Sequence, residues 1–215
     1  MPSVWAQKVS KRQRLFSSKV TISIIYKITT VDRRPDVDPS KSRQLTSNLI
    51  PIMSSAGLSP STHPLLAMTR LHLELLLMAL PSNQNQDHLD EAIRTAAKYN
   101  AGLSNILPFG HPVRGIALAE LGKLLAVDEP SPHDSNLPSQ PTFPPSGLAR
   151  LKLALETLVR AREELYIGFG KGSGGGQVGK EVRETIIRLE GELGAWTTGV
   201  KNVIEDARAA GQITT

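Results

Sequence analysis

The feature that most constrains the fold is a long register of apolar residues near the C-terminus. Between residues 178 and 207, apolar side chains recur every three or four positions: Val178, Val182, Ile186, Leu189, Leu193, Trp196, Val200, Val203 and Ala207. This spacing marks one face of an α-helix, so a helix is predicted from about Val178 to Ala210. Gly191, Gly194 and Gly199 favour a bend there, but the unbroken register argues against an interruption.

Four further helical patterns precede this one, and almost no stretch alternates in the manner of a strand. Helices are expected at residues 64–80, at 87–103, from 113 to before 130, and at 146–168. Asp87 is a suitable N-cap for the second of them, and Ser146 for the fourth. The body of the chain is therefore predicted to be all-α.

One face of the fourth helix is expected to carry its apolar stripe. Leucines recur along it at helical spacing: Leu148, Leu151, Leu155, Leu158 and Leu165. Charged residues such as Arg150, Lys152 and Arg160 lie mostly off that stripe, so the leucines are expected to face the core.

The net charge of +5 is concentrated at the N-terminus. Residues 1–31 hold six basic residues and no acidic one, whereas the remainder has nineteen basic against twenty acidic residues. The body therefore lacks the clustered charge that binding to nucleic acid requires. Residues 1–31 are expected to be a disordered basic lead or a segment foreign to the natural start, with a mitochondrial transit peptide as the alternative.

Turn-forming residues divide the rest of the chain. Residues 32–61 contain four prolines and a glycine and are expected to form a linker without a long helix, so 1–61 is predicted to be a disordered lead. The helical domain is placed at 62–210 with a tail at 211–215. Within it, 128–147 reads as a proline-rich loop and 168–177 as a glycine-rich connection between helices.

Two kinds of catalytic or cofactor site are disfavoured. The stretch GFGKGSGGGQVGKE has the spacing of a phosphate-binding loop, but an amphipathic helix precedes it and Glu181 stands where a metal-binding hydroxyl is needed. A flexible turn between helices is the preferred interpretation. The chain has no cysteine, and its five histidines show no paired spacing for a metal. No catalytic, cofactor or metal residue is assigned, and Arg70, His72 and Glu74 interrupt the most apolar helix too early for a membrane span.

The segment LPFGHPVRGIALAELGKLLAVDEP, residues 107–130, resembles the C-terminal helical domain of the SET- and MYND-domain lysine methyltransferases. GHPVRG and LGKL are its specific parts, and a weaker likeness continues through ARLKLALETLVRA and IIRLEGEL. The resemblance covers about residues 62–210. It implies a tetratricopeptide-like stack of about five antiparallel helices, with His111 and Pro112 starting one helix and Gly122 letting its neighbour approach closely.

The chain lacks the motifs of a complete enzyme of this family. Without cysteine a MYND zinc finger is impossible, and the methyl-donor and lysine-channel motifs of a SET domain are missing. The resemblance therefore implies a noncatalytic helical domain or fragment for partner binding or regulation. A free-standing peptide-binding scaffold unrelated to methylation is the alternative. Either reading favours the cytoplasm or nucleus.

The expected partner is a protein or peptide. In the resembled family this domain packs over the SET core and engages acidic chaperone tails, so either is a candidate. Basic side chains usually hold such a tail. The candidates for that role are Lys98, Arg114, Lys123, Arg150 and Lys152. For Arg114 a structural salt bridge is favoured over contact with a ligand.

Overall fold

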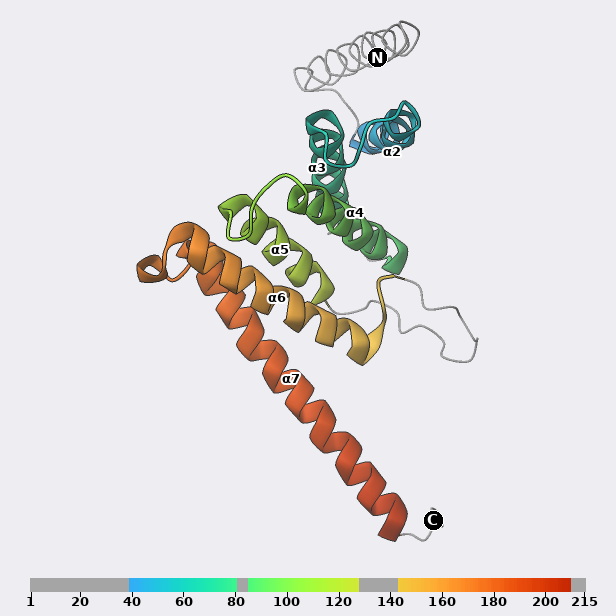
Figure 1. Cartoon of the computed structure of the whole chain (residues 1–215). Coiled ribbons are helices and arrows are strands. Elements are labelled where there is room, and N and C mark those ends of the chain that lie inside the picture. Colours follow the sequence, from blue (N-terminus) through green and yellow to red (C-terminus); the bar gives the residue numbers. More distant parts are fainter. Residues whose placement is uncertain (1–38, 81–84, 128–142, 210–215) are drawn as a thin grey trace, which may run out of the picture. The chain divides into compact units, whose positions relative to one another are not determined.

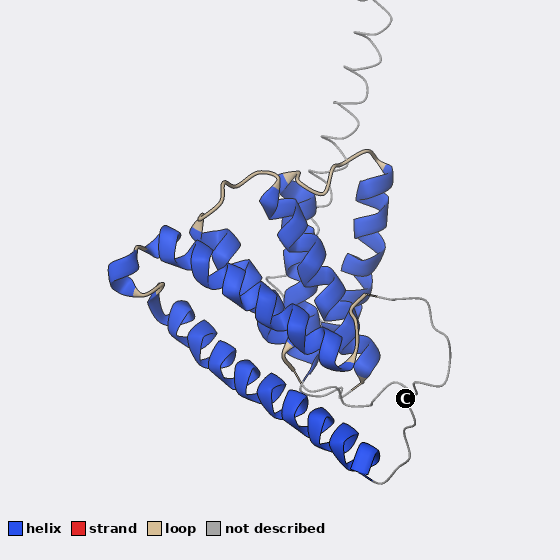
Figure 2. Ribbon diagram, turned by 60° about the horizontal axis from the view of Figure 1, so that its bottom comes forward, coloured by secondary structure: helices blue, strands red, loops and turns tan. Residues whose placement is uncertain are grey.

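The computed structural model describes residues 39–80, 85–127 and 143–209. Over these ranges the chain forms α-helices, one short 3-10 helix and no strand, which confirms the predicted all-α class (Figure 1 and Figure 2). The chain divides into two units, Met1–Met78 and Ala79–Thr215. The predictions for the basic lead, for most of the proline-rich loop and for the C-terminal tail lie outside the described residues.

The first unit contains a helix that the sequence analysis did not predict. Helix α2 runs from Pro39 to Ser55 with Pro51 inside it, within the segment expected to be a linker without a long helix. That expectation is wrong for these residues. Pro51 lies near the end of α2, where it removes one backbone hydrogen bond without ending the helix. Gly57 (φ +85°) follows the end of the helix; its N–H donates to the Ser54 carbonyl, while the Leu58 N–H donates to the Met53 carbonyl. This bonding pattern is the glycine-terminated Schellman cap.

Helix α3, His63–Ala79, completes the described part of this unit. These bounds differ by one residue at each end from the predicted 64–80, so the predicted helix is confirmed. Met53, Leu65 and Met68 form a small buried cluster. In the same unit the Nδ1 atom of the buried His72 lies 2.7 Å from the Thr46 hydroxyl, which itself donates to the Arg43 carbonyl. The single proton of that hydroxyl is thereby used, so Nδ1 of His72 donates and the histidine is a packed core residue.

The second unit stacks four helices in chain order. They are α4 (Gln86–Ser104), α5 (Pro112–Leu125), α6 (Gly147–Phe169) and α7 (Gly176–Ala209). All four match the predicted helices to within about two to four residues at each end, the usual uncertainty of such bounds. The N-cap of α4 differs from the predicted one. It is Asn85 and not Asp87, and its side chain accepts the N–H of Asp87. His111 caps α5 as expected, with Pro112 in its first position.

Two glycines bring α5 and α6 unusually close. A Cβ at Gly122 would lie 2.6 Å from Leu158 Cγ, and one at Gly115 would lie 2.9 Å from Leu165 Cγ. The two glycines are seven residues apart, which puts them on one face of α5. As residue numbers rise along α5, those of the facing leucines fall along α6, so the pair is antiparallel. The expectation that Gly122 permits a close approach is confirmed.

This close approach turns α6 away from its expected orientation. The predicted stripe of leucines is only partly buried, with Leu148 exposed and Leu151 and Leu155 intermediate. The buried face of α6 consists instead of Arg150, Ala154, Leu158, Ala161, Glu164 and Leu165. The missing side chains of the two glycines leave space for Leu158 and Leu165, while Ala154 and Ala161 are the small residues on this face.

The glycine-rich stretch forms the turn between α6 and α7, as predicted, but it is closely packed. A 3-10 turn spans Lys171–Ser173, and Gly174 adopts the left-handed conformation at φ +60°. Arg183 reaches back from α7 to donate to the Gly174 carbonyl and to the Tyr166 hydroxyl. A Cβ at Gly179 would lie 2.3 Å from that same carbonyl oxygen. Gly174 is thus required by its left-handed backbone and Gly179 by its close contact with the Gly174 carbonyl oxygen.

Alanine substitutions at two helical glycines separate packing from helix propensity. Gly122→Ala is expected to destabilise the protein by roughly 1–3 kcal/mol, because Leu158 is fully buried and cannot move aside without strain. Gly191→Ala, on α7, is expected to stabilise it by up to about 1 kcal/mol, because a Cβ there meets nothing within 4 Å. Urea unfolding followed by circular dichroism measures both. Equal effects at the two glycines would contradict the close approach.

Candidate binding groove

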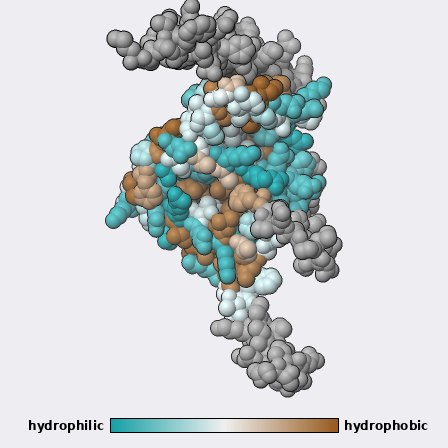
Figure 3. Space-filling model, turned by 45° about the vertical axis from the view of Figure 1, so that its right-hand side comes forward, coloured by the Kyte–Doolittle hydropathy of each residue, from teal (hydrophilic) through white to brown (hydrophobic). Residues whose placement is uncertain are grey.

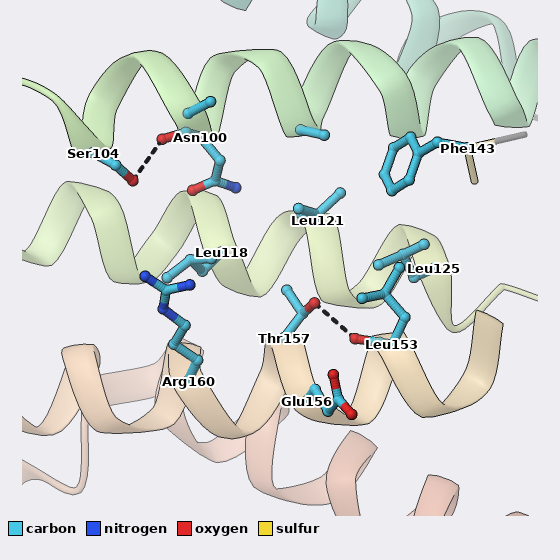
Figure 4. Close-up of a pocket in the computed structure, with 12 residues that line it drawn as sticks. Asn100, Ser104, Leu118, Leu121, Leu125, Phe143, Leu153, Glu156, Thr157 and Arg160 are labelled. Carbon is cyan, nitrogen blue, oxygen red and sulfur yellow. Dashed lines mark hydrogen bonds between the residues drawn. The ribbon is translucent and has the colours of Figure 1, made fainter. Parts of the chain in front are cut away.

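A groove with a volume of about 460 Å³ lies over α5, between α4 and α6. Leu118, Leu121 and Leu125 of α5 form its floor (Figure 4). Ala97 and Ala101 line the α4 side, and Leu153 and Thr157 line the α6 side. The space exists because the two alanines are too small to reach across α5 to α6. An apolar floor between two helical walls is the usual form of a binding site for a helix or peptide.

Three polar side chains that line the groove donate hydrogen bonds to backbone carbonyls. Asn100 Nδ2 donates to the Ala117 carbonyl, and the hydroxyl groups of Ser104 and Thr157 donate to carbonyls one turn earlier in their own helices, at 2.7–2.9 Å. Two of these bonds are drawn in Figure 4. The side-chain oxygens therefore face a ligand chiefly as hydrogen-bond acceptors. Donors on the ligand, such as side-chain hydroxyl or ammonium groups, would satisfy them.

Exposed groups complete the rim. Glu156 and Arg160, one turn apart on α6, add one charge of each sign. Phe143 lines the groove near Leu125 and Leu153, is 45% exposed, and is held through its carbonyl by the Arg94 guanidinium at 3.4 Å. Apolar patches bordered by polar residues are also visible on the surface of the chain in Figure 3. The groove thus combines an apolar floor with a rim of nearly balanced charge.

Arg114, one of the five predicted binding residues, lies in the interior. Its Nη2 donates to Glu164 Oε1 at 2.9 Å and its Nη1 to the Leu107 carbonyl at 3.0 Å. The other oxygen of Glu164 accepts the Gly110 N–H, and both charged side chains are buried. The network fastens the turn before α5 to α6. This is the structural salt bridge that was favoured for Arg114, and it leaves the guanidinium inaccessible to a peptide.

Arg150 is also interior, which corrects its expected place off the buried face of α6. Only 1% of the residue is exposed. Its guanidinium donates to the carbonyls of Leu124 and Leu125 at 3.2 and 3.1 Å, and Asp90 lies 3.9 Å away. It therefore caps the C-terminus of α5, where the last carbonyls lack partners in the helix and the dipole favours a cation. We assign Arg150 a structural role and no longer place it in a peptide groove.

The three predicted lysines do not converge on the groove. Lys98 and Lys152 are exposed on α4 and α6, and Lys123 forms an ion pair with Glu181 of α7. None of the three lines the groove, whose lining residues are uncharged apart from Glu156 and Arg160. Contact of these lysines with an acidic peptide stays a prediction. The groove itself was missed because it is assembled from ordinary leucines, alanines and polar residues on three helices.

Other kinds of site find little support in the described ranges. No three histidine, aspartate or glutamate side chains there gather closely enough to hold a metal ion. Among the helices described, we find none with the length and apolar character needed to cross a bilayer. Exposed charged pairs such as Arg188 and Glu192 are explained as contacts within one helix.

The fold and the groove define an all-α helical stack with a potential binding surface. No protein-family model matches the chain, and no curated protein matches it either. The likeness to the SET- and MYND-domain proteins therefore depends on the residues of the chain itself, chiefly those at 107–125.

Buried and exposed arginines on α6 should differ sharply in their effect on stability. Arg150→Ala is expected to destabilise the protein by about 3–5 kcal/mol, because the α5 carbonyls and Asp90 would lose a buried cation. Arg160→Ala, one of the exposed rim residues, should change stability by no more than about 0.5 kcal/mol. Chemical unfolding of both variants measures the difference. Similar small effects would show that the α5 carbonyls do not depend on Arg150.

The ion pair between Lys123 and Glu181 predicts a pH-dependent contribution to stability. The hydrogen bond and charge of Lys123, with a smaller effect of Gln177, hold the pKa of the Glu181 carboxyl below its ordinary value of 4.5. A lowered pKa in the folded state stabilises the protein above pH 4.5, and the stabilisation is lost as the pH falls through the folded value. The pair is partly exposed, so the effect is expected to be small.

Lys123→Met tests this contribution. The free energy of unfolding of the variant should fall below that of the parent at neutral pH, and the difference should shrink below pH 4.5. Lys180→Met, which changes an exposed lysine beside Glu181, is the control and should show no such pH dependence. A difference for Lys123→Met that stays constant with pH would contradict the ion pair as its cause.

Proposed function

We propose that this chain is a noncatalytic helical domain that binds a protein or peptide partner in the groove between α4 and α6. The observation that carries the proposal is the apolar floor of Leu118, Leu121 and Leu125, bordered by Asn100 and Thr157, each of which donates a hydrogen bond to a backbone carbonyl. Only 9% of Leu118, 9% of Leu121 and 1% of Leu125 is exposed, so a ligand would gain free energy chiefly by filling the groove with apolar side chains. It would need few specific polar contacts.

The dimensions of the groove favour a short amphipathic segment as the ligand. Its α4 wall runs from Ala97 to Ser104, which is about 10 Å at the rise of an α-helix. That length matches two turns of a docked helix, and the volume accommodates two or three aliphatic side chains at i, i+3 or i+4, and i+7 spacing. The opposite charges of Glu156 and Arg160 would orient a segment that carries a complementary charge at each end.

We further propose that the domain derives from a SET- and MYND-type lysine methyltransferase and acts with a SET core, in the cytoplasm or nucleus. The support is GHPVRG with LGKL, and the start of α5 at His111 and Pro112. A purified SET core of that family mixed with this chain should co-elute with it. Failure to co-elute, with peptide binding retained, would favour the alternative of a free-standing peptide scaffold, which the groove supports equally.

Filling the groove should abolish binding without unfolding the protein. Ala101→Trp places a large side chain at an exposed position of the groove wall, whereas Glu184→Trp places one on an exposed part of α7 outside it. Amphipathic peptides selected from a library on the parent protein are then titrated by fluorescence polarisation. Ala101→Trp should weaken them at least about tenfold, or by roughly 1.4 kcal/mol. Glu184→Trp should leave the affinity unchanged.

Two outcomes would count against the groove. If a peptide has the same affinity for the parent and for both tryptophan variants, it binds outside the groove. An acidic peptide that is weakened by Lys98→Ala and Lys152→Ala, but not by Ala101→Trp, would place the binding surface at the exposed lysines instead.

A further inference from the structure

The second half of α7 continues the apolar register of the first half, but its side chains up to Thr198 are not buried. Val182, Ile186 and Leu189 are buried, whereas no described side chain from Glu190 to Thr198 is. Trp196 is 56% exposed. The reason is length: α7 has 34 residues and α6 has 23, or about 51 Å against 35 Å of helix. Figure 1 shows α7 continuing past the N-terminal end of α6.

The apolar register of α7 has the spacing of a coiled-coil seam. From Val182 onward the apolar residues of the sequence are separated by four and three positions in strict alternation, through Ile186, Leu189, Leu193, Trp196, Val200, Val203 and Ala207. That alternation is the a and d pattern by which two helices pack along each other. The three glycines of this region fall outside the a and d positions. The pattern therefore continues beyond the point where α6 can use it.

We propose that this segment pairs with the same segment of a second copy of the chain, in antiparallel orientation. Helices α5 and α6 both pack against the first half of α7, where the seam is buried up to Leu189, and α6 runs antiparallel to α7. A parallel second copy would bring its own body alongside and meet α6 on the same seam. An antiparallel copy enters from the C-terminal end and occupies the line on which α6 stops, so neither copy has to release its own α6.

The sequence of the segment is self-complementary in that arrangement. Beyond the buried Leu189, its apolar positions 193, 196, 200 and 203 are symmetric about residue 198, so antiparallel pairing places each of them opposite another apolar position. This is the property that an interface with twofold symmetry requires. The acidic Glu192 beside the seam is paired with Arg188 of its own helix at 2.8 Å, which reduces its repulsion of a second copy. Few leucines and three glycines predict a weak dimer that dissociates on dilution.

The oligomeric state of the full chain and of two matched variants tests the proposal. Sedimentation velocity of the parent should show a monomer that becomes a dimer as concentration rises. Trp196→Glu should remain monomeric at every concentration while keeping its helical circular dichroism. Ile187→Glu removes a side chain that is 69% exposed but lies off the seam, and should dimerise like the parent. A parent that stays monomeric, or a dimer that survives Trp196→Glu, would overturn the pairing.

Single cysteines test the orientation, because the chain has none of its own. Thr197→Cys lies next to the symmetry point at residue 198, so antiparallel copies hold its two sulfurs at nearly the same level. Glu190→Cys occupies the equivalent position one heptad earlier, where its two copies would be about 24 Å apart along the axis. Mild oxidation should therefore crosslink the first variant and not the second. Crosslinking of Glu190→Cys alone would refute the antiparallel arrangement.

Discussion

The contact between α5 and α6 at Gly115 and Gly122 is the constraint on which the second unit depends. Each glycine faces a fully buried leucine of α6, and no side chain larger than hydrogen fits at either position. Close approach of two backbones maximises dispersion contacts and determines which face of α6 is buried. The rest of α6 follows from this: alanines lie on its inner face, and several leucines move to its sides.

The two buried arginines follow from the same close packing. Drawing α6 onto α5 removes water from both ends of α5, where backbone groups lack helical partners. Arg150 satisfies the carbonyls at one end, and Arg114 with Glu164 connects the turn at the other. A shift of α6 by one turn would leave these charges buried without partners, at a cost of several kcal/mol each. The arginines thus fix the register of the helices that the glycines bring together.

The sequence predicts most of the helices because apolar periodicity is a local property, and it predicts the role of Gly122 through a motif. It does not predict the burial of Arg150, since a charged residue among polar neighbours is ordinarily a surface residue, and only the α5 terminus makes burial favourable. It misses α2 because Pro51 was taken to end any helix. Gly57, counted among the breakers, is in fact the cap that marks where that helix ends.

Unequal helix lengths explain why this unit retains two apolar surfaces. Helix α5 has 14 residues and lies between α4 with 19 and α6 with 23, so small residues on α4 leave the floor of the groove reachable between longer neighbours. Helix α7 is the longest and exceeds the neighbour that covers it. An exposed apolar side chain such as Trp196, at 56%, gains free energy when a partner covers it. The part of α7 that extends beyond α6 and the groove over α5 are therefore the places where association with other chains is most favourable.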